Sequence, residues 1–82
     1  MVDTKTKEGR MTQAQAISAA GKIAGHGACD SVGIIPPLAP STQWAVQFKI
    51  TGHPAVYRVA RSIARQTHAE VSNICGNDVT IC

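Results

Sequence analysis

The chain has 82 residues, a net charge of +3 and an apolar share of 44%. A chain this short forms one domain with a thin core. Its polar first ten residues resemble neither a secretory signal nor a membrane anchor, and no apolar stretch approaches the roughly 20 residues of a membrane-spanning helix. We therefore expect a flexible leader at residues 1–10, a single domain at residues 11–82, and no membrane partner.

Three cysteines without a secretory signal indicate a reducing compartment. We therefore expect a cytoplasmic protein whose cysteines remain thiols.

The positive charge is unevenly distributed. Between Ser31 and Ala69 there is no Asp or Glu, and four basic residues give this stretch a charge of +4, while the rest of the chain sums to −1. Those residues are Lys49, Arg58, Arg61 and Arg65. A local basic surface on a nearly neutral body favours an anionic partner.

The pattern from Thr12 to about Ala24 predicts a first helix. Thr12 and Gln15 have the spacing of a capping box, and Gly25 and Gly27 end the pattern. An arc of about 120° gathers its apolar residues and predicts the buried face. These residues are Ala16, Ile17, Ala20, Ile23 and Ala24.

Residues 26–42 would make an unusually long loop for a compact domain. We expect a short strand at residues 32–35, ended by Pro36 and Pro37, because proline donates no hydrogen bond to a ladder. The following residues 43–51 alternate between apolar and polar side chains, which predicts a half-buried strand. Its inward residues are Trp44, Val46, Phe48 and Ile50.

A second amphipathic helix is predicted after His53, with Pro54 in its first turn. Its predicted inner side carries Val56, Val59, Ala60, Ile63 and Thr67. Its opposite side carries Arg58, Arg61, Arg65 and His68. We expect all three aromatic residues, Tyr57 included, to lie in the core or at its edge.

Residues 69–82 predict a hairpin around Gly76, Asn77 and Asp78. A two-residue loop places Ile74, Val79 and Ile81 on one face, whereas a three-residue loop aligns Val71 and Cys75 with Val79 and Ile81. Continuation of the second helix to Asn73 is the alternative.

These elements give the order α-(β)-β-α-β-β. The expected fold is α+β, with three or four short strands in an antiparallel or mixed sheet and two helices on one face.

The sequence shows no catalytic signature. It has no paired carboxylates, no phosphate-binding glycine loop and no triad, so we expect no enzyme and no cofactor. His26 and Cys29 are the one close pair of possible zinc ligands, and the spacing of Cys75 and Cys82 fits no standard zinc site. We expect no metal, and a zinc-stabilised domain is a minor alternative.

We predict a small binding protein whose second helix docks an anionic macromolecule, with nucleic acid or a nucleoprotein complex as the first choice. Arg58, Arg61 and Arg65 would make the contacts, and Lys49 and His68 would support them. The alternative is a protein–protein adaptor or inhibitor that uses the same arginines or an apolar patch. A homodimer would place two basic helices side by side.

Overall fold

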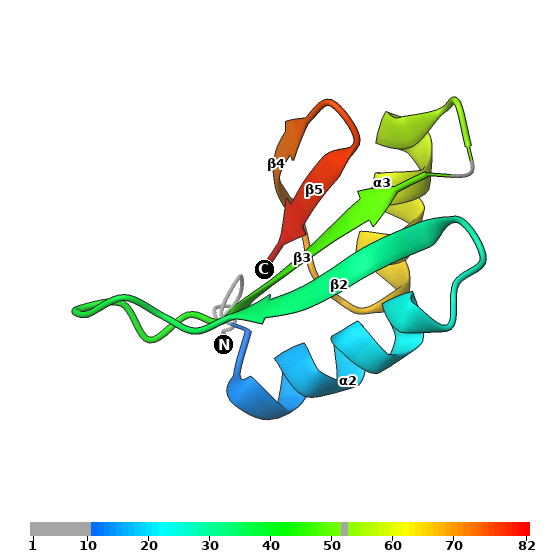
Figure 1. Cartoon of the computed structure of the whole chain (residues 1–82). Helices are drawn as coiled ribbons and strands as arrows, with labels where there is room; N and C mark the ends of the chain where they lie inside the picture. The colour runs from blue at the N-terminus through cyan, green and yellow to red at the C-terminus, as the bar shows by residue number, and fades with distance from the viewer. Residues whose placement is uncertain (1–10, 52) are drawn as a thin grey trace.

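A four-stranded antiparallel sheet carries both helices on one of its faces in the computed structural model, which describes residues 11–51 and 53–82 (Figure 1). The elements are α2 Gln13–Ala24, β2 Cys29–Ile35, β3 Ala45–Ile50, α3 Val56–Gln66, β4 Val71–Cys75 and β5 Asp78–Ile81. The strands follow the order β2-β3-β5-β4 across the sheet. The α+β fold and element order predicted from the sequence are confirmed, whereas the leader at residues 1–10 lies outside the described residues.

The core is centred on β3, as its alternating sequence predicts. Val46, Phe48 and Ile50 are fully buried, whereas Gln47 and Lys49 are exposed. Alternate residues of a strand point to opposite faces of the sheet, so the buried set faces the helices. The other face carries Gln47 and Lys49 and is called the open face below.

Helix α2 packs on β2 and β3. Its capping box is present: the Gln15 N–H donates to the Thr12 hydroxyl at 3.2 Å, and the Thr12 N–H donates to Gln15 Oε1 at 2.8 Å. The buried residues are Ala16, Ala19 and Ile23, and the predicted inner residues Ile17 and Ala24 are exposed. The buried face of α2 is therefore rotated about the helix axis relative to the predicted one.

Helix α3 covers the sheet near β3 and β4. Ala60, Ile63 and Ala64 are buried, and Val56 and Val59 pack partly against the same core. The prediction that Pro54 lies in the first turn is wrong, because Ala55 is the N-cap and the helix begins at Val56.

The last two strands form the hairpin with the two-residue loop. Cys75 pairs with Asp78 and Ile74 pairs with Val79 across a turn in which Gly76 has a φ of 63°. An irregularity between Val71 and Asn73 brings Val71 opposite Ile81, which places Val71 against the core as well. Helix α3 therefore does not continue to Asn73.

Strand β2 begins at Cys29, three residues before the predicted start, and its register shifts between Asp30 and Gly33. Residues 36–44 then leave the body of the domain as a long loop (Figure 1). Among the residues that the structure describes, no helix is long and apolar enough to cross a membrane.

Candidate anion-binding surface

The outer side of α3 carries Arg58, Arg61 and Arg65, called the arginine row below. All three side chains belong to exposed residues. Spacings of three and four residues place them on one side of a helix, and the row extends over about 10 Å at the helical rise per residue. The buried face of α3 lies on the sheet, so the helix presents the row to solvent.

Tyr57 joins this surface, which corrects its predicted place in the core or at its edge. The residue is 61% exposed, and Arg61 Cζ lies 5.6 Å from the centre of its ring. This is a cation–π distance. The signal in the sequence was the four-residue spacing between Tyr57 and Arg61, which places the ring beside the guanidinium group on a helix.

A shallow groove of about 460 Å³ lies between α3 and the start of β4. It is called the α3–β4 groove, and its lining residues are Tyr57, Arg61, Ala64, Arg65, Ala69, Glu70 and Val71. Beside the groove the chain makes a tight turn from α3 to β4, in which the Ala69 N–H donates to the Ala64 carbonyl at 2.8 Å. The groove thus combines an aromatic ring, two guanidinium groups, small apolar side chains and one carboxylate.

The arginine row borders a second shallow hollow on the outside of the same helix. Its lining residues are Tyr57, Arg58, Arg61, Ser62 and Arg65. Tyr57, Arg61 and Arg65 line both hollows, so they form the ridge between them. A ligand on this surface would contact all three side chains.

The guanidinium groups of the row have no acidic partner within 4.0 Å in the described part of the chain, where the one ion pair joins Lys49 and Asp78. Glu70 lines the groove beside Arg61 and Arg65 without reaching that distance. No close carboxylate of the described residues therefore neutralises the row, and Glu70 is the one acid among the groove's lining residues.

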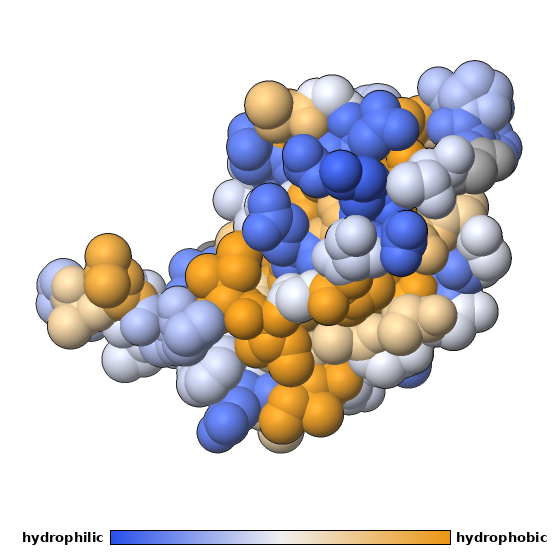
Figure 2. All heavy atoms as spheres, viewed as in Figure 1, coloured by the Kyte–Doolittle hydropathy of each residue, from blue (hydrophilic) through white to orange (hydrophobic). Residues whose placement is uncertain are grey.

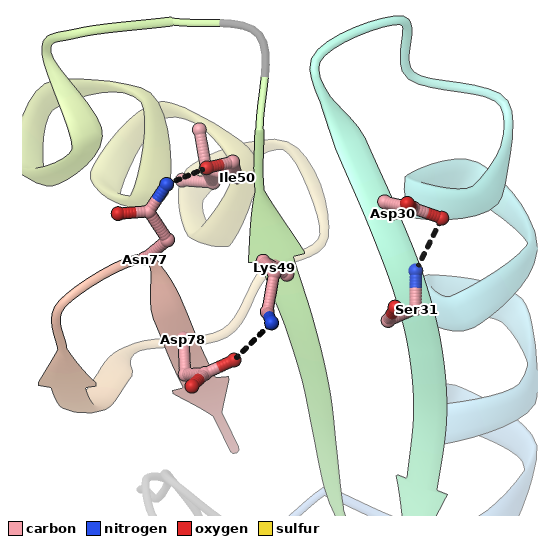
Figure 3. A network of polar contacts seen from close by, with 6 residues as sticks. All are labelled: Asp30, Ser31, Lys49, Ile50, Asn77 and Asp78. Carbon is pink, nitrogen blue, oxygen red and sulfur yellow. Dashed lines mark hydrogen bonds and ion pairs between the residues drawn. The ribbon is translucent and has the colours of Figure 1, made fainter.

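Lys49 does not join the row. It projects from the open face of the sheet, where its Nζ lies 4.0 Å from Asp78 Oδ1 (Figure 3). Asp30 is its cross-strand neighbour on β2 and accepts a hydrogen bond from the Ser31 N–H at 2.8 Å. Two aspartates thus flank Lys49, and they weaken its attraction for a further anion.

His68 is also separated from the row. Helix α3 ends at Gln66, and His68 takes a positive φ of 58° after the C-cap Thr67. His68 is therefore not on the side of α3 where a continued helix would have placed it. His68 instead lines a small hollow with residues of α2, among them Gln15, Ser18 and Lys22.

Apart from Tyr57, the large exposed apolar side chains of the described residues lie outside α3. Figure 2 shows hydrophilic residues over the end of the sheet where β4 and β5 lie, and hydrophobic residues lower, over β2 and α2. The most exposed of the large apolar side chains is Leu38 in the long loop, and Ile34 and Ile35 at the end of β2 are also exposed.

The cysteines belong to no possible metal-binding cluster among the described residues. Cys29, Cys75 and Cys82 are free thiols, and no three His, Cys, Asp or Glu side chains of the described residues converge on one point. Desolvation by burial raises the pKa of the Cys29 thiol. A raised pKa reduces the thiolate that a nucleophile or metal ligand needs.

No family model, curated protein or solved structure matches the chain.

Proposed function

We propose that this protein is a small, non-enzymatic binding protein whose helix α3 docks an anionic macromolecule, with nucleic acid or a nucleoprotein complex as the first choice. The observation that carries the proposal is the exposed arginine row together with Tyr57, whose ring centre lies 5.6 Å from Arg61 Cζ. Guanidinium groups bind phosphates through two parallel hydrogen bonds, and an exposed aromatic ring adds a surface on which bases stack.

The proposal places the protein in the cytoplasm. Reducing conditions there would keep Cys29, Cys75 and Cys82 as thiols. Homodimer formation belongs to the same proposal, because a second copy would double the number of arginines available to one nucleic-acid strand.

A protein–protein adaptor or inhibitor is the second candidate. It is favoured by the exposed apolar residues Ile34, Ile35 and Leu38, since exposed apolar patches mark contact surfaces. This interface would lie around the end of β2 and the long loop, away from α3. Its affinity would depend weakly on salt, because apolar contacts release no counterions from a partner.

The test compares two variants that each remove two positive charges. Arg58→Gln/Arg61→Gln removes them from α3, and Lys22→Gln/Lys49→Gln removes them from α2 and the open face. We expect fluorescence anisotropy with short labelled DNA and RNA to show binding that weakens from about 50 mM to about 200 mM salt. The α3 variant should lose affinity by at least tenfold, because each phosphate contact contributes on the order of 1 kcal/mol or more.

The control variant should bind almost as the wild type does. Equal losses in the two variants would contradict a role specific to α3 and leave only non-specific attraction by net charge. Absence of binding at low salt would contradict the nucleic-acid proposal. Circular dichroism of both variants must first show native helix content.

A further inference from the structure

We propose that the α3–β4 groove holds one unpaired base of a single-stranded nucleic acid, and that Glu70 makes guanine the preferred base there. This inference rests on the proposed function and makes it more specific. It names the form of nucleic acid and the chemical feature that is recognised.

The lining of the groove suits the face of a base better than a duplex. Ala64, Ala69 and Val71 give it an apolar inner side, and Tyr57 and Arg61 border it with a ring and a planar guanidinium group. Paired bases hide their faces inside the stack, whereas bases of single strands stack on aromatic rings and guanidinium planes. The volume of about 460 Å³ is within the range of small-ligand sites.

Glu70 is the feature that phosphate binding alone does not explain. A carboxylate beside Arg61 and Arg65 repels phosphates, yet Glu70 lines the groove. Its backbone is held there by pairing with the last residue: the Glu70 N–H donates to the Cys82 carbonyl and the Cys82 N–H donates to the Glu70 carbonyl, both at 3.0 Å. An ionised carboxylate accepts hydrogen bonds and donates none. A ligand that contacts Glu70 must therefore present hydrogen-bond donors to it.

Guanine is the base that meets this requirement best. Its Watson–Crick edge presents two adjacent N–H donors, N1–H and N2–H, which the two oxygens of one carboxylate can accept together. Cytosine and adenine place a ring-nitrogen acceptor next to their amino group, and uracil and thymine flank N3–H with two carbonyls. Each of these acceptors would repel the Glu70 carboxylate.

The arginine row completes the site. Arg58 faces the outer hollow but does not line the groove, whereas Arg65 lines both. With a base in the groove, the flanking phosphates would run along the outer side of α3, where Arg58 and Arg65 lie about 10 Å apart along the helix. The strand would thus cross the ridge formed by Tyr57, Arg61 and Arg65.

The experiment measures anisotropy with short oligothymidylates that differ at one central position, which is guanine, adenine, cytosine, thymine or abasic. RNA oligonucleotides with the same series in a uracil background, and a duplex that contains the same guanine paired, complete the set. We expect the guanine strand to bind about tenfold more tightly than the thymine strand, since one bidentate contact to a base edge discriminates against other bases by about this factor or more. The duplex and the abasic strand should bind at least as weakly as the thymine strand.

Two variants test the assigned roles. Tyr57→Leu should weaken binding of the guanine strand by about tenfold, because stacking on the ring is lost. Glu70→Gln should bind the thymine strand at least as tightly as the wild type, because a negative charge is removed, while the ratio of guanine to thymine affinity falls towards one. The control Asp78→Asn removes an acid from the open face and should leave that ratio unchanged.

The outcomes separate this inference from the proposed function. Binding that requires the arginine row but is indifferent to the central base, or equally tight for duplex and single strand, would overturn the inference and leave the proposed function standing. Absence of arginine-dependent binding to every strand would overturn both. The abasic strand tests the base contact with the unmodified protein, so a variant that fails to fold cannot leave the inference undecided.

Discussion

Ile23 and Ile17 lie on the same helix and differ sharply in burial: Ile23 is 1% exposed and Ile17 is 56% exposed. Helical periodicity predicted an arc that contained both residues. The centre of an arc made mostly of alanine is weakly defined, because alanine is tolerated on both the buried and the exposed side of a helix. Contact with β2 and β3 decided the centre, and it brought Ala19 into the core in place of Ile17.

This difference predicts unequal effects of the same substitution. Ile23→Val should lower the free energy of unfolding by about 1 kcal/mol, because a buried methyl group is lost from a packed site. Ile17→Val should change it by less than about 0.5 kcal/mol, as exposed substitutions usually do. Both variants keep a β-branched side chain in α2. Urea denaturation measures the two values, and equal losses would contradict the burial assigned to this helix.

The candidate site shows the same limit of single-residue reasoning. The arginine row was predictable because three arginines at helical spacing leave the opposite side for Ala60 and Ile63. His68 was assigned to the row only by extending the helix past Gln66, where the chain turns. Lys49 was assigned to the same surface because it adds to the local positive charge, and charge alone does not tell which face of the sheet a side chain occupies.

At the scale of elements, strong local patterns predicted structure well and weak ones did not. The alternation of β3 and the capping box of α2 are both present. Near the start of β2, Asp30 is a poor strand former and Ser31 has a positive φ of 54°. Cys29 and Asp30 pair with Ile50 and Lys49 of β3, a partner strand that local sequence does not reveal. The α3–β4 groove likewise exists only because a helix and a strand meet.

Two glycines in different elements predict opposite effects of Gly→Ala. Gly76 turns the β4–β5 hairpin with a φ of 63°, so Gly76→Ala should lower the free energy of unfolding by about 1 kcal/mol. Gly21 lies within α2, and an added methyl group there would meet nothing within 4 Å. Gly21→Ala should therefore raise the free energy of unfolding by about 0.5–1 kcal/mol. Thermal unfolding of both variants, measured by circular dichroism, checks the signs. A stabilised Gly76→Ala variant would contradict the turn.

At the scale of the molecule, the two faces of the sheet differ in character. One face lies under both helices and holds the core, while no other element of the described residues covers the open face with its Asp30, Lys49 and Asp78 charges. The hairpin is joined to β3 at the far end of the sheet: Asn77 Nδ2 donates to the Ile50 carbonyl at 2.7 Å, and the Ile50 N–H donates to the Asn77 carbonyl at 2.9 Å (Figure 3). These contacts extend the pairing of the two inner strands, β3 and β5, into the hairpin turn.

This arrangement predicts the order of amide hydrogen exchange. Amides of β3 and β5 should exchange most slowly, because each of these strands is paired on both sides and carries the largest buried side chains. Outward-facing amides of the edge strands β2 and β4, and those of residues 36–44, should exchange fastest. Nuclear magnetic resonance at two protein concentrations measures both sets. Outer-edge protection that rises with concentration would mean that a second copy covers β2 or β4, and the proposed homodimer would then form through the sheet. Protection independent of concentration would exclude pairing at these edges and leave the exposed apolar residues near the long loop as the surface for self-association.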